Sequence, residues 1–190
     1  TIAAQGFGAD AASANEVLLA EQSGIPSDRI YYSAPGKTLQ DIQKVWGKCT
    51  IIADSLSELD RLEQCAAVNN ERIAVGVRVN PDFSMNGNSA VSSKFGIDEE
   101  QLITADLRFP HLKIIGIHVH LRSQILDADI LCEYYRNCYM LAERMSGLNG
   151  VEIQFINFGS GIGTVYDSTT EKPLALEKVG QTLQTLGAKN

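Results

Sequence analysis

Apolar runs typical of β-strands alternate along the chain with amphipathic stretches typical of α-helices. The strand pattern occupies residues 29–33, 50–53, 72–80, 113–120 and 151–158, and residues 1–10 could hold another strand. Helical spacing of apolar positions occupies residues 39–46, 99–106, 127–145 and 174–186. Ser13 with Glu16 and Ser55 with Glu58 form capping boxes, which predict two further helix starts. A helix is therefore expected after nearly every strand.

The strands are expected to form a parallel sheet. The runs IAVGVRVN and KIIGIHVH are almost continuously apolar, as strands buried on both faces are. An open doubly wound sheet and a (β/α)8 barrel both fit this α/β pattern, and about six βα units are too few to close a barrel. We favour a partial TIM barrel, forming a single domain over residues 1–190.

The composition narrows the possible partners. The chain has 190 residues, 44% of them hydrophobic, and a net charge of -7, which argues against nucleic acid because phosphate binding needs clustered Lys and Arg. No stretch reaches the roughly 20 apolar residues that span a bilayer. No leader pattern opens the chain either, so we expect no membrane partner and a cytoplasmic location. The 4 cysteines lack metal-site spacing, which favours packed thiols.

Polar residues or glycines follow each predicted strand. Ligands of parallel βα folds bind at the carboxyl ends of the strands. The residues at these ends are Asp10, Ser33, Asp54, Ser55, Arg78, Asn80, His118, His120, Ser123, Asn157, Gly159, Ser160, Gly161 and Gly163. A small-molecule site is expected among them.

Three of these features admit both a binding and a structural interpretation. The glycine run INFGSGIG could receive a phosphate on its backbone amides or form a tight corner. Of His118 and His120, we expect only one to point toward a ligand while the other packs elsewhere. Arg78, inside an apolar strand, needs an anionic partner, and a salt bridge to Asp10 or Asp54 fits as well as ligand contact.

Seven sequence blocks together resemble one enzyme family. They are GADAASANE, SAPGK, IIADSLSELDRL, VRVNPD, SKFGI, GIHVHLRSQ and INFGSGIG, and they span about residues 6–166. Their order and approximate spacing are similar to those of diaminopimelate decarboxylases and, more distantly, of ornithine and arginine decarboxylases. An alanine-racemase-like barrel shares the implied fold but not the HVHLRSQ and SKFGI blocks. The resemblance implies the central part of a pyridoxal-phosphate (PLP)-binding barrel of fold type III.

The resemblance also implies pyridoxal 5'-phosphate as the cofactor and gives roles to matching positions. Asp10 is similar to an aspartate that supports the cofactor lysine, Ser33 to a small residue near the cofactor ring, and Arg78 to an arginine of the pocket. His120 is similar to the histidine that stacks on the pyridine ring, and His118 to a supporting histidine. The positions that match the phosphate-holding residues are Ser123, Gly159, Ser160, Gly161 and Gly163.

Two departures from the family pattern fall in this phosphate region. Arg122 stands where the family block H-I-G-S-Q has glycine, and Ser160 replaces the middle of three glycines. Arg122 could make a charge-assisted contact with the phosphate or crowd the backbone, and we predict the contact.

The Schiff-base lysine of the family is expected on a first barrel strand upstream of Asp10, where this sequence has no lysine. Lys94 is the nearest alternative, but it belongs to the separate SKFGI block. The last barrel strands and a C-terminal β-domain that completes a homodimer are also expected outside this chain. No catalytic residue is therefore assigned, and the chain alone is expected to be inactive, with doubtful cofactor occupancy.

In the intact protein, the resemblance implies a carboxy-lyase that converts meso-diaminopimelate into L-lysine. Decarboxylation of ornithine, lysine or arginine is an open alternative. A catalytically silent PLP-binding or regulatory relative is another, which the changed glycine positions would suit.

Overall fold

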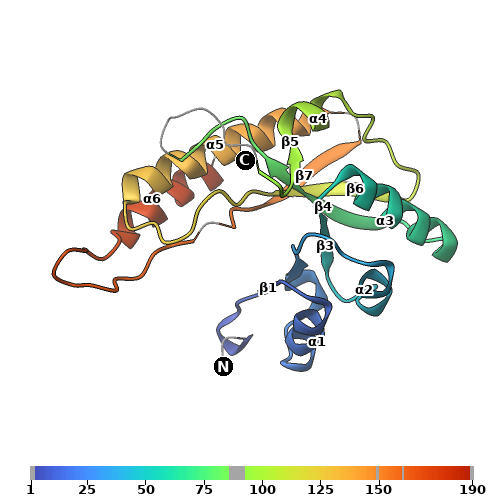
Figure 1. Ribbon diagram of the computed structural model, residues 1–190, viewed down its shortest axis with the longest axis horizontal. Helices are drawn as coiled ribbons and strands as arrows, with labels where there is room; N and C mark the ends of the chain where they lie inside the picture. The colour runs from blue at the N-terminus through green and yellow to red at the C-terminus, as the bar shows by residue number, and fades with distance from the viewer. Residues whose placement is uncertain (1–2, 86–92, 149, 160, 189–190) are drawn as a thin grey trace.

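The computed structural model describes residues 3–85, 93–148, 150–159 and 161–188 (Figure 1). The strands are β1 (Ala9–Ala11), β2 (Ile30–Tyr32), β3 (Thr50–Ala53), β4 (Ile73–Asn80), β5 (Ile97–Asp98), β6 (Leu112–His118) and β7 (Val151–Asn157). The helices are α1 (Ala14–Gln22), α2 (Leu39–Lys44), α3 (Leu56–Asn69), α4 (Glu99–Thr104), α5 (Ala128–Ser146) and α6 (Leu176–Gly187). Short 3-10 turns η1 (Ala3–Gln5) and η2 (Ser27–Arg29) complete the described elements.

The strands form one parallel sheet whose order follows the chain. The path is β1-β2-β3-β4-β6-β7, with the short β5 paired to β4. A doubly wound sheet reverses its strand order at a switch point. This path has no reversal, so the predicted parallel α/β architecture is confirmed and its winding is that of a barrel.

The sheet is strongly curved, as side-chain contacts between strands from the two ends of the path show. Asn157 in β7 donates from Nδ2 to Oδ2 of Asp10 in β1 at 2.8 Å. The rings of Tyr31 in β2 and Phe155 in β7 have centroids 4.9 Å apart. In a flat sheet the neighbouring strands are each about 4.8 Å apart, so these residues would lie several strand spacings from one another. The curvature encloses an interior.

Phe155 fills this interior because two glycines make room for its ring. A Cβ on Gly116 of β6 would lie 2.3 Å from ring carbons of Phe155, and one on Gly76 of β4 would lie 3.1 Å from its Cζ. The same Cβ on Gly76 would lie 3.2 Å from Cγ1 of Ile52, which is fully buried in β3. A large ring over small residues is how small barrels fill a tapering interior.

The other side of the strands packs against the helices. The buried cluster there joins strand residues Ile30, Ile51, Val75, Val77 and Ile117 to helix residues Val17, Leu59, Leu62, Leu131 and Leu141. Helices α5 and α6 lie side by side along one edge of the molecule (Figure 1). Among the described residues, no helix combines the length and the apolar character that crossing a bilayer requires.

The two predicted capping boxes begin α1 and α3, with one difference. Ser13 and Ser55 each accept the amide of the glutamate three positions later, at 3.2 Å. The glutamates reach one residue further back than in the usual box: Glu16 accepts the amide of Ala12 and Glu58 that of Asp54, both at 2.7 Å. Both predicted helix starts are confirmed.

The predicted strand over residues 113–120 is wrong at its end. Strand β6 stops at His118, because the ladder to β7 closes with the amide of Val119 donating to the carbonyl of Asn157. His120 therefore lies beyond the strand.

Candidate functional site

A polar layer lies directly above the apolar interior, at the carboxyl ends of the strands. Residues two apart on a strand share a face. Two positions beyond the interior residues Tyr31, Ile52, Gly76, Gly116 and Phe155 stand Ser33, Asp54, Arg78, His118 and Asn157. The register places Arg78 beside His118 and His118 beside Asn157. Residues from across the sequence therefore form one layer.

Asp10 joins the two ends of this layer. Its carboxylate accepts the hydroxyl of Ser33 at 2.5 Å and the side-chain amide of Asn157 at 2.8 Å. Asp10 and Ser33 were both predicted as site residues, and the fold brings them together. Asn157 was noted only as a strand end, so its part in this contact needed the curvature of the sheet.

Arg78 and Asp54 form a partly buried ion pair. The guanidinium Nη1 and Oδ1 of Asp54 are 3.4 Å apart, and the guanidinium also lies 5.0 Å from the ring centroid of Phe95. Burial raises the pKa of Asp54, and the amide of Gly96 and the charge of Arg78 oppose that rise. Of the alternatives left open for Arg78, the structure has the salt bridge to Asp54.

His118 is buried and uncharged at neutral pH. It is 5% exposed, and its Nδ1 has no hydrogen-bond partner among the described residues. Burial, followed by the charge of Arg78, lowers its pKa to about 4. A buried nitrogen without a partner costs about 1–3 kcal/mol, so it marks a position where a ligand atom would be favourable.

His120 faces the same turn as His118. Its Nδ1 contacts the carbonyl oxygen of Gly159, and its Nε2 lies 3.4 Å from the hydroxyl of Ser123. A Cβ on Gly159 would lie 2.5 Å from Nε2 of His118 and 2.9 Å from Cβ of His120. Both side chains therefore border Gly159, and which of them would face a ligand stays a prediction.

The loops that leave β6 and β7 run side by side. The amide of Gly161 donates to the carbonyl of Arg122 at 3.4 Å, and that of Gly163 donates to the carbonyl of Ile125 at 2.8 Å. Added Cβ atoms would lie 2.4 Å from Cα of Ser123 for Gly161 and 2.9 Å from the carbonyl of Ile125 for Gly163. These glycines thus permit close backbone approach, and their amides are already used within the protein.

The same loop pairing is extended by Gln124. Its side-chain amide donates to the carbonyl of Thr164 and accepts the amide of Thr164 at 3.2 Å. Gln124 has a φ of 61°, a conformation that is uncommon for residues with a Cβ. Gly159 begins the second loop with a φ of 52°. The predicted site residue Ser160 lies outside the described residues.

Arg122 is exposed, and the described residues give its guanidinium no hydrogen-bond or ion-pair partner. It lies in the loop that carries Ser123, the hydroxyl nearest to His120. Its predicted contact with a phosphate stays a prediction.

Sequence reasoning missed a buried charge pair behind this layer. Lys37 donates from Nζ to Oε2 of Glu58 at 3.0 Å and to the carbonyls of Ala34 and Ile52, both at 2.6 Å. The side chains of Lys37 and Glu58 are 0% and 3% exposed. Burial lowers the pKa of Lys37, and Glu58 opposes that effect. Glu58 also accepts the amide of Asp54, so the pair fixes the ends of β2 and β3.

The signal for this pair was present in the sequence but was interpreted locally. Glu58 was assigned to a capping box, and Lys37 appeared only as the last residue of the SAPGK block. Only the packing of α3 against β3 brings the two side chains together.

The four cysteines are free, and burial raises the pKa of the Cys49 and Cys138 thiols to about 12, consistent with packed thiols.

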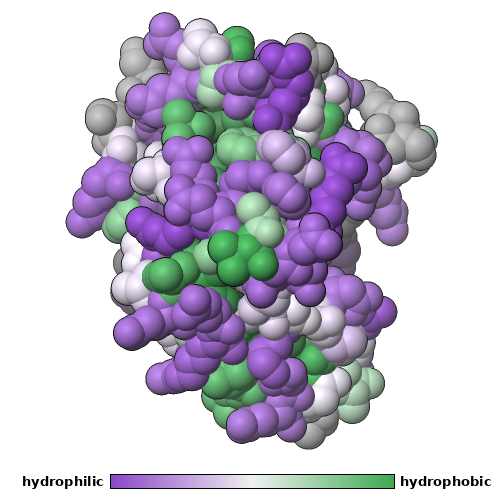
Figure 2. Space-filling model, turned by 90° about the vertical axis from the view of Figure 1, so that its right-hand side faces the viewer, coloured by the Kyte–Doolittle hydropathy of each residue, from purple (hydrophilic) through white to green (hydrophobic). Residues whose placement is uncertain are grey.

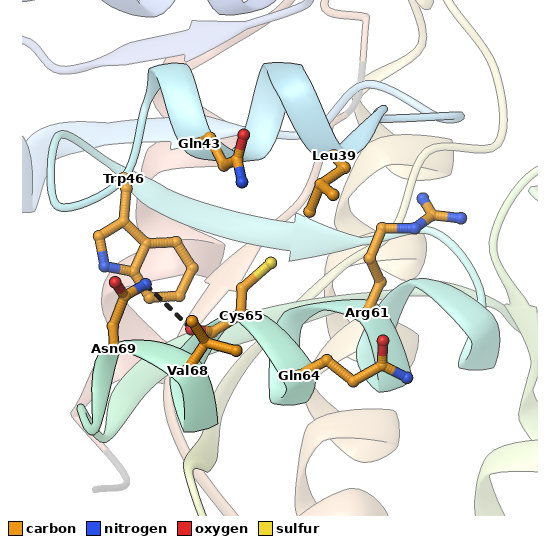
Figure 3. A pocket seen from close by; sticks show the side chains of 8 residues that line it. All are labelled: Leu39, Gln43, Trp46, Arg61, Gln64, Cys65, Val68 and Asn69. Carbon is orange, nitrogen blue, oxygen red and sulfur yellow. Dashed lines mark hydrogen bonds between the residues drawn. The ribbon is translucent and has the colours of Figure 1, made fainter.

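A separate pocket lies on the outer layer, between α2 and α3. Its volume is about 620 Å³, and its lining side chains are shown in Figure 3. The face presented in Figure 2 is mainly hydrophilic, with small apolar areas between polar side chains. None of the strand-end residues described above lines the pocket between α2 and α3.

The family of this chain follows from comparison with known proteins. Residues 1–189 match the model of the pyridoxal-dependent decarboxylase family, pyridoxal-binding domain. The chain belongs to this family. The chain is 33% identical over 187 residues to the L-glutamyl-(BtrI acyl-carrier protein) decarboxylase of Niallia circulans, covering 94% of this chain and 44% of the relative. It is also 30% identical to the diaminopimelate decarboxylase of Aquifex aeolicus, with 88% of this chain and 42% of that relative covered.

Solved structures agree with the fold of this chain. The crystal structure of Helicobacter pylori diaminopimelate decarboxylase complexed with L-lysine matches with a TM-score of 0.83 and 25% identity, over 97% of this chain and 49% of that one. The predicted partial PLP-binding barrel is confirmed by this match. The chain spans less than half the length of the curated relatives it matches.

The strand ends suit a phosphate-bearing aromatic group. Among the described residues, Nδ1 of buried His118 and the exposed guanidinium of Arg122 have no partner, and a ligand could satisfy both groups. The half-buried ring of His120 and the hydroxyl of Ser123 border the same turn. Gly161 and Gly163 fit as space-making residues, because their amides are engaged with the neighbouring loop.

Proposed function

We propose that the strand ends bind pyridoxal 5'-phosphate and that the whole protein is an amino-acid decarboxylase. The observation that carries the proposal is the meeting of His118, His120 and Gly159 at one turn, in a chain that matches a pyridoxal-binding domain. His120 is the candidate for contact with the cofactor ring, and Ser123 and Arg122 are the candidates for the phosphate.

Pyridoxal phosphate, when bound, withdraws electrons from the α-carbon of an amino acid and so permits loss of its carboxylate as carbon dioxide. The residues of this chain would bind and orient. Asp10 holds Ser33 and Asn157 in place, and Asp54 holds Arg78, so these polar groups are fixed before any ligand arrives. His118 stays neutral at physiological pH and presents Nδ1 without charge.

The lysine that binds the cofactor covalently is proposed to lie outside residues 1–190. The buried Lys37 is committed to Glu58. Lys94 lies 5.1 Å from the ring centroid of Phe95, in the loop that follows β4. We propose that the chain alone binds the cofactor weakly and is inactive, and that the whole protein is a cytoplasmic homodimer.

The proposed substrate is meso-diaminopimelate, with L-lysine as the product. Diaminopimelate decarboxylases recur among the relatives and among the solved structures. The relative from Niallia circulans is named for a glutamyl group on a carrier protein, which makes a carrier-bound amino acid the second candidate substrate. A silent PLP-binding relative would bind the cofactor and release no carbon dioxide.

The cofactor proposal is tested by titrating the chain with pyridoxal phosphate and following ligand absorbance. We expect saturable binding that His120→Ala and Ser123→Ala each weaken roughly tenfold, the value of one charge-assisted hydrogen bond or ring contact. Ser168→Ala, at an exposed position in the loop after β7, is the control and should bind as the unaltered chain does. Equal binding by all variants would contradict the site.

The lysine and substrate proposals need two further measurements. Borohydride reduction of the chain with pyridoxal phosphate, followed by peptide mass spectrometry, should show no lysine labelled stoichiometrically. One fully labelled lysine would contradict the proposed location of the cofactor lysine. Release of carbon dioxide by the whole protein, measured with meso-diaminopimelate, lysine, ornithine, arginine and carrier-bound glutamate, identifies the substrate.

A further inference from the structure

Tyr134 connects the two loops of the candidate site from behind. It lies in α5, is 1% exposed, and donates its hydroxyl to the carbonyl of Val119 at 2.7 Å and to that of Phe158 at 2.6 Å. The first carbonyl directly precedes His120, and the second directly precedes Gly159. One hydroxyl hydrogen is thus shared between the points where β6 and β7 give way to their loops.

The surroundings of Tyr134 leave its hydroxyl little freedom. Its ring packs against Phe83, with centroids 6.4 Å apart, and against Tyr135, with centroids 5.7 Å apart. Cys138 lies one helical turn further along α5, and burial raises the pKa of Tyr134. A buried hydroxyl needs a partner, and here it has the backbone carbonyls that directly follow two different strands.

Through Tyr134, α5 is hydrogen-bonded to both strand ends. Beyond Tyr134, the loops are held together by the contact of His120 with Gly159 and by the Gly161 and Gly163 amides. The hydroxyl therefore sits at the base of the paired loops, and loss of its hydrogen bonds would free both loops where they begin.

We propose that Tyr134 is a positioning residue, whose hydroxyl sets the spacing between the His120 loop and the Gly159 loop and thereby the affinity of the site for a phosphate group. The statement about affinity rests on the proposed function; the statement about spacing does not. Tyr134 does not touch the proposed ligand and acts through Val119 and Phe158.

The test compares Tyr134→Phe with Tyr32→Phe in the full chain. Each change removes one hydroxyl from a buried tyrosine and keeps the ring. Tyr32 lies in β2, where Nζ of Lys37 is 5.2 Å from its ring centroid, and it is not among the residues that bond to Val119 or Phe158. Amide hydrogen exchange of Gly161 and Gly163, measured by NMR, reports directly on loop pairing.

We expect Tyr134→Phe to speed exchange at these two amides roughly three- to tenfold, the effect of losing about one net hydrogen bond, and Tyr32→Phe to leave it unchanged. Equal exchange in the two variants would overturn the positioning role. Binding of pyridoxal phosphate and of pyridoxal, which lacks the phosphate, supplies the second measurement.

Tyr134→Phe should weaken the binding of pyridoxal phosphate by a similar factor and leave the binding of pyridoxal unchanged. Equal weakening of both would overturn the link to the phosphate while leaving the spacing result standing. If the unaltered chain binds neither compound, the proposed function of this chain fails, and the exchange measurement still decides the role of Tyr134.

Discussion

The buried pair of Lys37 and Glu58 gives the sharpest prediction about stability. Lys37→Met keeps the length of the side chain but removes its charge and its hydrogen bonds to Glu58, Ala34 and Ile52. The carboxylate of Glu58 would then remain buried, with only backbone amides as partners. An uncompensated buried charge is unfavourable, so the folded state should lose stability.

The expected loss is about 3–5 kcal/mol, the range measured when one partner of a buried pair is removed. A domain of this size has a free energy of unfolding of about 5–15 kcal/mol, so the change is large but leaves a folded population. The control is Lys48→Met. Lys48 pairs with Glu21 at 2.7 Å, but the two side chains are 35% and 44% exposed, so its loss should cost about 0–1 kcal/mol.

Equilibrium unfolding in urea, followed by far-ultraviolet circular dichroism, measures both variants. The double variant Lys37→Met/Glu58→Gln removes both charges and should recover at least about 1–2 kcal/mol of the loss. A loss for Lys37→Met no larger than that for Lys48→Met would refute the argument, because the pair would then behave as a surface contact. A double variant less stable than Lys37→Met would refute the charge as the cause.

Two further predictions concern the barrel interior. Burial lowers the pKa of His118 to about 4 from an ordinary 6.5, so the folded state binds this proton less readily than the unfolded chain does. The free energy of unfolding should therefore fall by up to about 3 kcal/mol as the pH drops from 6.5 toward 4. In His118→Gln, urea midpoints should fall less over this pH range, because the contribution of His118 is gone. An equal pH dependence in the variant and the unaltered chain would contradict the prediction. Gly116→Ala places a Cβ 2.3 Å from the Phe155 ring and should cost about 1–3 kcal/mol. Adding Phe155→Leu should restore much of this in thermal unfolding, whereas a double variant less stable than Gly116→Ala would show that Phe155 is not the obstacle.

The alternation of apolar strands and amphipathic helices was enough to predict the parallel α/β architecture. Period-two and period-3.6 patterns, serine caps and continuous apolar runs are local properties, so β3, β4, α5 and the start of α3 were predicted within a few residues. The order of polar strand ends predicted which side of the sheet carries the site. The seven sequence blocks predicted the family, which the match over residues 1–189 confirms.

The contacts that build the site were decided only by tertiary structure. Whether Arg78 meets Asp10 or Asp54, and whether Asp10 reaches Asn157, depends on how far the sheet curves. The end of β6 at His118 depends on pairing with β7, which is distant in the sequence.

The same limit explains the residues that sequence reasoning missed. Lys37 in a turn, Glu58 in a helix cap and Tyr134 on an apolar helix face each have an ordinary local explanation. Their roles arise because folding buries them beside carbonyls and charges from other strands, and burial makes an unpaired polar group costly. The sequence by itself determined the elements and the family of this protein, and the curvature of the sheet decided which polar groups meet.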